Sequence, residues 1–236
     1  MTTPVEERAF STDWQRRPGL SGPCWGLDAM SDSPPDIVDT FASAATFYTD
    51  LVDTIAASAL TGPGLGDWDL RALVGHTSRS LTTVTTYLGQ PADRVEVESA
   101  AAYYVWVVQQ VGADPAAVAE RGRQAGIALG DDPAAAVRRL SEDAVAAVRA
   151  VEGDPVIHTM AGGMRLSDYL PTRIFELVVH TFDIAAALNR DVVPPAEALA
   201  DAVDLATELA GLKGDGPALL LALTGRKPLP EGYSVL

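Results

Sequence analysis

The chain has 236 residues, of which 47% are hydrophobic, and its formal net charge is −15 at pH 7. This length suits one large domain, or a domain with a small appendage, and the apolar content is enough for a sizeable core. The acidic charge argues against nucleic acids and acidic membrane surfaces as partners, because phosphate groups bind to basic surfaces.

Cysteine usage and hydropathy narrow the class of protein further. Cys24 is the only cysteine, so an internal disulfide and a cysteine-based zinc cluster are both excluded. The first residues, MTTPVEERAFSTDWQRRPG, contain no apolar signal-peptide core, and no apolar run approaches the roughly 20 residues of a membrane span. We therefore expect a soluble, cytoplasmic protein that does not enter a membrane.

The N-terminal part of the chain changes character at Asp36. Residues 1–35 are rich in Pro, Gly and Ser, which predicts an irregular extension. From Asp36 the sequence DIVDTFASAATFYTDLVDTIAASAL has apolar residues at helical spacing. A second helix is predicted over DWDLRALVGHTSRSLTTVTTYLG, with Asp67 or Asp69 at its N-terminus and Gly89 after its end.

Three more helices are predicted in the middle of the chain. They cover AAYYVWVVQQV, DPAAVAERGRQAGIAL and DDPAAAVRRLSEDAVAAVRAV. The last of these is the clearest, because acidic residues and a proline open its first turn. Two short apolar runs then flank Gly162 and Gly163 and predict a β-hairpin or a looped excursion.

The C-terminal part continues the helical pattern. A long helix is predicted over SDYLPTRIFELVVHTFDIAAALN, with Pro171 early in it and Asn189 at its end, and another over PPAEALADAVDLATELAGL. Strand signals are scarce, so we expect an all-α bundle of long up-and-down helices with a small hairpin. We assign residues 36–205 to the bundle and residues 206–236 to a short C-terminal appendage that closes over it.

Ionisable residues interrupt the apolar faces of two predicted helices. Glu176 and His180 are four residues apart and project from one helix face, and His76 lies beside the inward face of the second helix. Burial of such groups is unfavourable unless they are paired or bound. Two histidines and a glutamate are the composition of a catalytic zinc site with an open coordination position, and they also suit Fe(II) or nickel.

A second interpretation of these residues involves no metal. In it, Glu176 forms an ion pair with Arg173 along the helix, and His180 is a hydrogen-bonded core residue. Spacing alone does not decide between the two interpretations, because a glutamate four residues before a histidine is common by chance.

Two segments that carry these residues resemble the motifs of a known family. GLGDWDLRALVGHTSRS (64–80) and MRLSDYLPTRIFELVVHTFDIAAAL (164–188) are similar to the two metal-binding motifs of the DinB-like superfamily, in its actinobacterial branch of mycothiol-dependent maleylpyruvate isomerase-like proteins. GDGPALLLALTGRKPLP is also similar to a recurrent C-terminal sequence of these proteins. The resemblance covers residues 36–236.

The resemblance implies a DinB-like four-helix bundle in which His76, Glu176 and His180 bind Zn²⁺, with Fe²⁺ or Ni²⁺ as alternatives. It also implies mycothiol as cofactor or co-substrate, with a small electrophilic substrate as the second partner. A metal-bound thiol is deprotonated at neutral pH. Its addition to an alkene followed by its departure is cis–trans isomerisation, whereas a thiol that stays attached gives an S-transferase.

Two other functions remain open on the same scaffold. One is a metal-dependent hydrolase or biosynthetic enzyme, in which the metal activates water or polarises a carbonyl group. The other is a non-catalytic bundle that binds a metal or another ligand. We expect the protein to be a monomer or a homodimer.

Three arginines are candidate catalytic residues beside the metal. Arg79 is one turn after His76, Arg173 is one turn before Glu176, and Arg226 belongs to the segment that we expect to fold over the cavity. Each can bind a carboxylate of the substrate or of the thiol by a bidentate contact. The alternative, for Arg79 and Arg173, is an ordinary salt bridge.

Other residues are candidates for supporting roles. Asp183, one turn after His180, is a candidate hydrogen-bond partner of that imidazole. His158 is a candidate acid or base at the cavity mouth, with passive exposure to solvent as the alternative. Tyr103, Tyr104 and Trp106 are expected to pack in the bundle, with lining of the substrate pocket as the alternative. Trp68 is expected to pack where the second helix begins.

Overall fold

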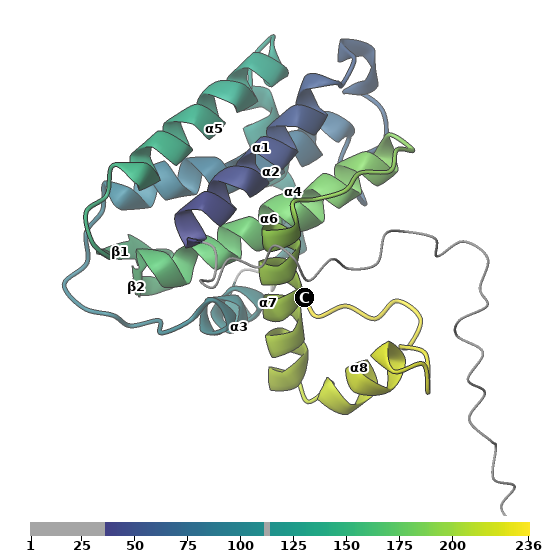
Figure 1. Ribbon diagram of the computed structural model, residues 1–236. Helices are drawn as coiled ribbons and strands as arrows, with labels where there is room; N and C mark the ends of the chain where they lie inside the picture. The colour runs from purple at the N-terminus through teal and green to yellow at the C-terminus, as the bar shows by residue number, and fades with distance from the viewer. Residues whose placement is uncertain (1–35, 111–113) are drawn as a thin grey trace, which may run out of the picture. The chain divides into compact units, whose positions relative to one another are not determined.

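The computed structural model describes residues 36–110 and 114–236, and this part of the chain is mostly helical (Figure 1). The all-α prediction is confirmed, whereas the prediction for residues 1–35 lies outside the described residues. None of the described helices is both long and apolar enough to cross a membrane. The elements in chain order are α1 (Ile37–Asp53), a 3₁₀ turn (Ala57–Ala59), α2 (Leu70–Leu88), α3 (Ala100–Gln110), α4 (Pro115–Ala128), α5 (Pro133–Arg149), β1 (Val156–Thr159), β2 (Gly162–Arg165), α6 (Leu166–Ala187), α7 (Ala196–Leu212) and α8 (Gly216–Leu223).

The ends of the helices are set by residues that the sequence made visible. α2 begins after Asp69, whose carboxylate accepts a hydrogen bond from the backbone N–H of Ala72 at 2.7 Å. α5 begins after Asp132 with Pro133 in its first turn. α6 ends just before Asn189, which has a φ of 53°, the left-handed conformation common after a helix. Local capping chemistry therefore accounts for these boundaries.

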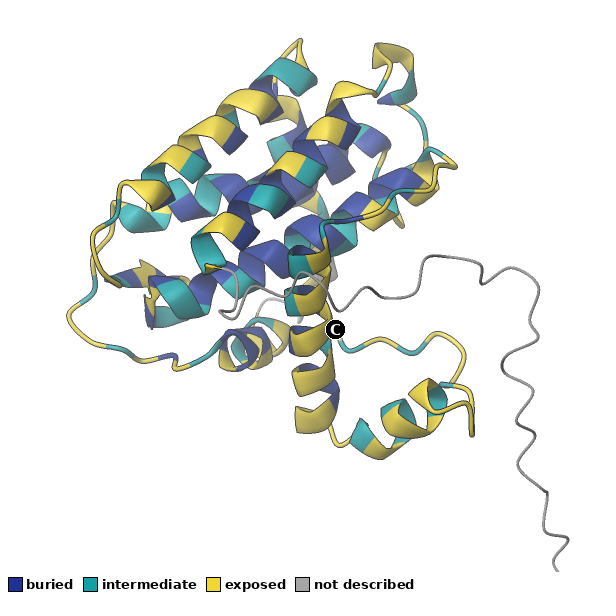
Figure 2. Ribbon diagram, viewed as in Figure 1, coloured by how far each residue is buried: buried dark blue, intermediate teal, exposed yellow. Residues whose placement is uncertain are grey.

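Four helices form the bundle: α1, α2, α5 and α6. α1 and α2 each contact both α5 and α6, so the four helices enclose a common core. Figure 2 shows the buried residues where these helices face one another. The predicted four-helix bundle is therefore confirmed. Its largest fully buried side chains include Phe41, Tyr48, Leu73, Leu81, Tyr169 and Leu177.

α4 packs against α2 with the two backbones in close contact. A Cβ atom built at Gly75 would lie 2.1 Å from the backbone nitrogen of Gly126, and one at Gly126 would lie 2.7 Å from the carbonyl oxygen of Arg71. Any side chain at either glycine would therefore force the helices apart. His76 follows Gly75, so the backbone of α2 beside His76 is held in close contact with α4.

The hairpin is present, but its turn is not where the glycines suggested. β1 and β2 pair antiparallel, with Thr159 opposite Gly162 and the turn at residues 160–161. Gly162 and Gly163 belong to β2 instead. A Cβ atom at Gly163 would lie 2.0 Å from the carbonyl oxygen of Arg94, in the connection that precedes α3. Glycine is needed here because another backbone approaches closely.

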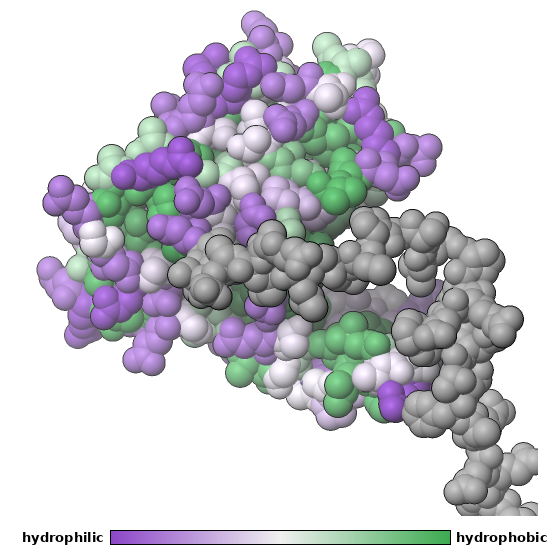
Figure 3. Space-filling model, in the orientation of Figure 1, coloured by the Kyte–Doolittle hydropathy of each residue, from purple (hydrophilic) through white to green (hydrophobic). Residues whose placement is uncertain are grey.

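Two further helices, α7 and α8, follow α6 in the chain. α7 is continuous through residue 205, so the predicted domain boundary falls inside a helix. α8 contacts α7, and Figure 3 shows apolar side chains at its surface, where Leu220 and Leu223 are exposed. Residues 233–236 line an apolar cavity of about 470 Å³ together with residues of α6, α7 and α8. Closure of this segment over the bundle stays a prediction.

Candidate metal site

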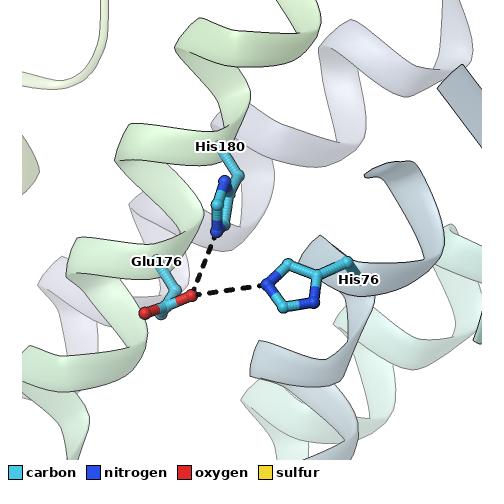
Figure 4. A group of neighbouring side chains, drawn as sticks. All are labelled: His76, Glu176 and His180. Atoms are coloured by element: carbon cyan, nitrogen blue, oxygen red, sulfur yellow. Dashed lines mark ion pairs between the residues drawn. The ribbon is translucent and has the colours of Figure 1, made fainter. Parts of the chain in front are cut away.

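The three predicted metal ligands lie together between α2 and α6 (Figure 4). Oε2 of Glu176 is 3.2 Å from Nε2 of His180 and 3.9 Å from Nε2 of His76. One donor atom of each residue lies within 4.8 Å of the other two. Ligand atoms around a tetrahedral zinc ion are about 3.3 Å apart, given bonds of about 2.0–2.1 Å. The donor types and their spacing therefore fit one metal ion with an open fourth position.

Both candidate ligands on α6 have a hydrogen-bond partner on their far side. Nδ1 of His180 is 2.9 Å from Oδ2 of Asp183, which confirms the predicted pairing. The hydroxyl of Tyr104, on α3, donates a hydrogen bond to Oε1 of Glu176 at 2.6 Å. These contacts leave Nε2 of His180 and Oε2 of Glu176 facing the common centre.

His76, on α2, is oriented mainly by packing. Its Nδ1 is buried and has no hydrogen-bond partner among the described residues. The ring of Trp68 lies against the imidazole, with ring centroids 4.5 Å apart, and Nε1 of Trp68 donates to the carbonyl of Ala119 on α4 at 2.8 Å. His76 is therefore oriented by the aromatic contact and by the packing of α2 against α4, whereas His180 is oriented by a hydrogen bond.

The three groups differ in protonation state. Burial and the charge of His180 lower the pKa of His76 to about 4. Burial also opposes a charge on His180, but its hydrogen bonds to Asp183 and Glu176 outweigh it and raise the pKa of His180 to about 9. Burial opposes ionisation of Glu176 too, yet His180 and Arg173 hold the pKa of this carboxyl below its usual value. The metal-free site at neutral pH thus holds a carboxylate, an imidazolium and a neutral imidazole.

Two of the three predicted arginines lie near this group. The guanidinium of Arg173 is buried, 4.9 Å from the ring centroid of Tyr169 and 5.6 Å from that of Tyr103. Arg79 is close enough for its charge to contribute to the lowered pKa of His76. Neither arginine has an ion-pair partner among the described residues. The alternative ion pair between Arg173 and the glutamate of α6 is therefore not formed.

The other two candidates, Arg226 and His158, lie among residues outside this group. Arg226 is exposed in the segment after α8, and its Nη1 donates to the carbonyl of Thr224 at 3.0 Å. It is not among the charged groups that act most on the three candidate ligands. His158 is on the exposed side of β1, where it lines a surface pocket with Arg94 and Glu96. The structure thus brings neither residue to the three ligands.

Two aromatic contacts of the site were not apparent from the sequence. Tyr103 and Tyr104 are both 3% exposed, as the packing prediction required. The pattern did not show that Tyr104 donates to Glu176, or that Trp68 lies against His76. Helical periodicity gives no signal for either contact. The contact of Tyr104 with Glu176 joins α3 to α6 by tertiary packing, and Trp68 precedes the N-cap of α2, outside the helical repeat that places His76.

Comparison with known proteins identifies the family. The chain matches the family model described as the mycothiol maleylpyruvate isomerase N-terminal domain over residues 41–185, which is more than half of the chain. The matched region contains His76, Glu176 and His180. No curated protein and no solved structure matches the chain.

Proposed function

The chain belongs to the family of the mycothiol maleylpyruvate isomerase N-terminal domain, and we propose that it is a cytoplasmic metal-dependent enzyme that uses mycothiol as cofactor or co-substrate. The reaction is isomerisation or thiol S-transfer on a small electrophilic metabolite. The observation that carries this proposal is the group of two imidazoles and one carboxylate at metal-ligand spacing. The family supports the choice of mycothiol.

His76, Glu176 and His180 would hold the metal, which we expect to be Zn²⁺, with Fe²⁺ or Ni²⁺ as alternatives. When bound, the metal supplies an open coordination position at which a thiol is deprotonated at neutral pH. The role of the protein is to orient the ligands, and Asp183 does this for His180 through its hydrogen bond. Recognition of the substrate would depend on other residues around the metal.

Arg79 and Arg173 support an anionic substrate, or a thiol that carries a carboxylate. A guanidinium as buried as that of Arg173 normally has an anionic partner. Its Nε donates a hydrogen bond to Oγ1 of Thr172 at 2.9 Å, and its charge lowers the pKa of Glu176, but no described carboxylate is within ion-pair distance of it. The rings of Tyr103 and Tyr169 fix its position. A carboxylate that enters the site can therefore form a bidentate contact with an arginine that is already in place.

The test combines metal content with thiol dependence. We expect about one metal ion per chain in the wild-type protein by elemental mass spectrometry, and none in His180→Ala. Turnover of maleylpyruvate and of other small unsaturated acids is then measured with and without mycothiol. Activity that persists without mycothiol would favour the hydrolase alternative. A wild-type protein that stays metal-free after incubation with zinc would reject every metal-dependent function.

A further inference from the structure

We infer that Tyr104 is a positioning residue that keeps Glu176 a one-oxygen metal ligand. The inference rests on the proposed function, since it requires a metal bound by Glu176 and the two histidines. It concerns the geometry of ligation, which the identity of the ligands alone does not determine, because a carboxylate can bind a metal through one oxygen or through both.

The two oxygens of Glu176 have separate partners. Oε1 accepts the hydroxyl hydrogen of Tyr104 at 2.6 Å, within the range of strong hydrogen bonds to an ionised carboxylate. Oε2 faces the two imidazoles, 3.2 Å from Nε2 of His180 and 3.9 Å from Nε2 of His76. Two-oxygen ligation would require Oε1 to turn away from Tyr104 and toward the metal.

Tyr104 is held firmly enough to oppose that rotation. Its ring packs edge-on against Phe175, with centroids 5.4 Å apart, and against Tyr103 at 6.0 Å. Its hydroxyl is also 3.2 Å from the carbonyl oxygen of Thr172, on the same helix as Glu176. Since Tyr104 is only 3% exposed, water does not readily replace a lost hydrogen bond there. Rotation of the carboxylate would break the short hydrogen bond from Tyr104 and leave its hydroxyl with only the longer one to the carbonyl of Thr172.

The consequence concerns the open coordination position. With one oxygen from Glu176, the protein supplies three ligand atoms, and a four-coordinate zinc ion retains one position for the thiol. With both oxygens bound, the protein would supply four atoms and fill that position. Tyr104 would therefore keep the fourth coordination position open, although it lies on α3 and is not itself a ligand.

The experiment compares Tyr104→Phe with Tyr48→Phe. Both changes remove one buried tyrosine hydroxyl, but that of Tyr48 is bonded to Val74 and Ser78 in the bundle core and contacts no candidate ligand. We load each folded protein with Co²⁺ as a spectroscopic probe, and measure zinc affinity by competition with a chelator. We expect Tyr104→Phe to change the visible cobalt spectrum and to weaken zinc binding by about tenfold. Tyr48→Phe should retain the wild-type spectrum.

The outcomes separate this inference from the proposed function. A wild-type protein that binds neither cobalt nor zinc overturns both. Metal binding by the wild type with an unchanged cobalt spectrum in Tyr104→Phe overturns the role of Tyr104 alone. If that variant does not fold, a crystal structure of the zinc-loaded wild type decides. Oε2 alone within about 2.2 Å of zinc supports the inference, and both oxygens of Glu176 at bonding distance overturn it.

Discussion

The two helices that supply the candidate ligands support them in different ways. On α6, Glu176 and His180 each have a hydrogen-bond partner, Tyr104 and Asp183 respectively. On α2, His76 has a buried Nδ1 without a described partner. The α6 half of the site is thus oriented by directed polar contacts, and the α2 half by close packing.

This difference indicates which changes should affect each half. Hydrogen bonds hold a side chain directly, so the α6 half should respond to single polar substitutions in its surroundings. Packing holds His76 through the backbone of α2, so the α2 half should respond to changes at the α2–α4 contact. The following predictions test this contrast, beginning with the largest expected effect.

Gly75→Ala should destabilise the protein most. The added Cβ atom would lie 2.1 Å from the backbone nitrogen of Gly126, so the two helices must separate. We expect a loss of about 3 kcal/mol in the free energy of unfolding, measured with urea. Gly211→Ala in α7 is the control. No atom lies within 4 Å of a Cβ there, and we expect a gain of about 0.4–1 kcal/mol. A well-tolerated Gly75→Ala would show that the α2–α4 contact does not fix His76.

The stability of the metal-free protein should depend on pH in opposite directions for the two histidines. The folded pKa of His180, about 9, is above the unfolded value of about 6.5. Its stabilising contribution is therefore complete below pH 6.5 and is lost as the pH rises through 9. The folded pKa of His76, about 4, is below the unfolded value, so stability is lost as the pH falls from about 6.5 to about 4.

The alkaline loss should reach at most about 3 kcal/mol, and urea unfolding across this pH range measures it. His180→Ala should remove the alkaline loss, and His76→Ala the acidic one. Bound zinc should flatten the alkaline loss in the wild type, because the metal replaces the proton of His180. An alkaline loss unchanged in His180→Ala would assign it to another group.

Asp183→Asn should weaken zinc binding by about 10–100-fold, because His180 loses an ionised partner. Competition with a chromophoric chelator measures the change. Asp143→Asn is the control, because it removes the same charge from the exposed face of α5, a helix that carries no candidate ligand. It should leave zinc affinity unchanged. Equal affinities for the two variants would contradict a polar orientation of the α6 half.

Trp68→Phe should have the smallest effect. It retains an aromatic ring beside His76 but removes the hydrogen bond from Nε1 to the carbonyl of Ala119. We expect a loss of about 1 kcal/mol in stability by urea unfolding. The decrease in zinc affinity should be smaller than in Asp183→Asn. A larger decrease would mean that Trp68, rather than the backbone contact at Gly75, orients His76.

Much of the fold could be predicted because its causes are local. Helical periodicity, the cap at Asp69 and the stop at Asn189 act within a few residues, and the structure confirms them. The hairpin turn could not be placed in this way. Gly163 looked like a turn residue, but it is glycine because the backbone of Arg94 passes 2.0 Å from where a Cβ would lie.

The sequence by itself determined that Glu176 and His180 share a helix face, since a spacing of four residues is close to one helical turn. The place of His76 beside the inward face of the second predicted helix made it the third candidate, and the family resemblance favoured the metal-binding interpretation. Only the tertiary structure decided how these residues are supported. Tyr104 is 72 positions from Glu176, and their contact exists because α3 packs against α6. Contacts of this kind depend on how the helices pack, and no local spacing encodes that.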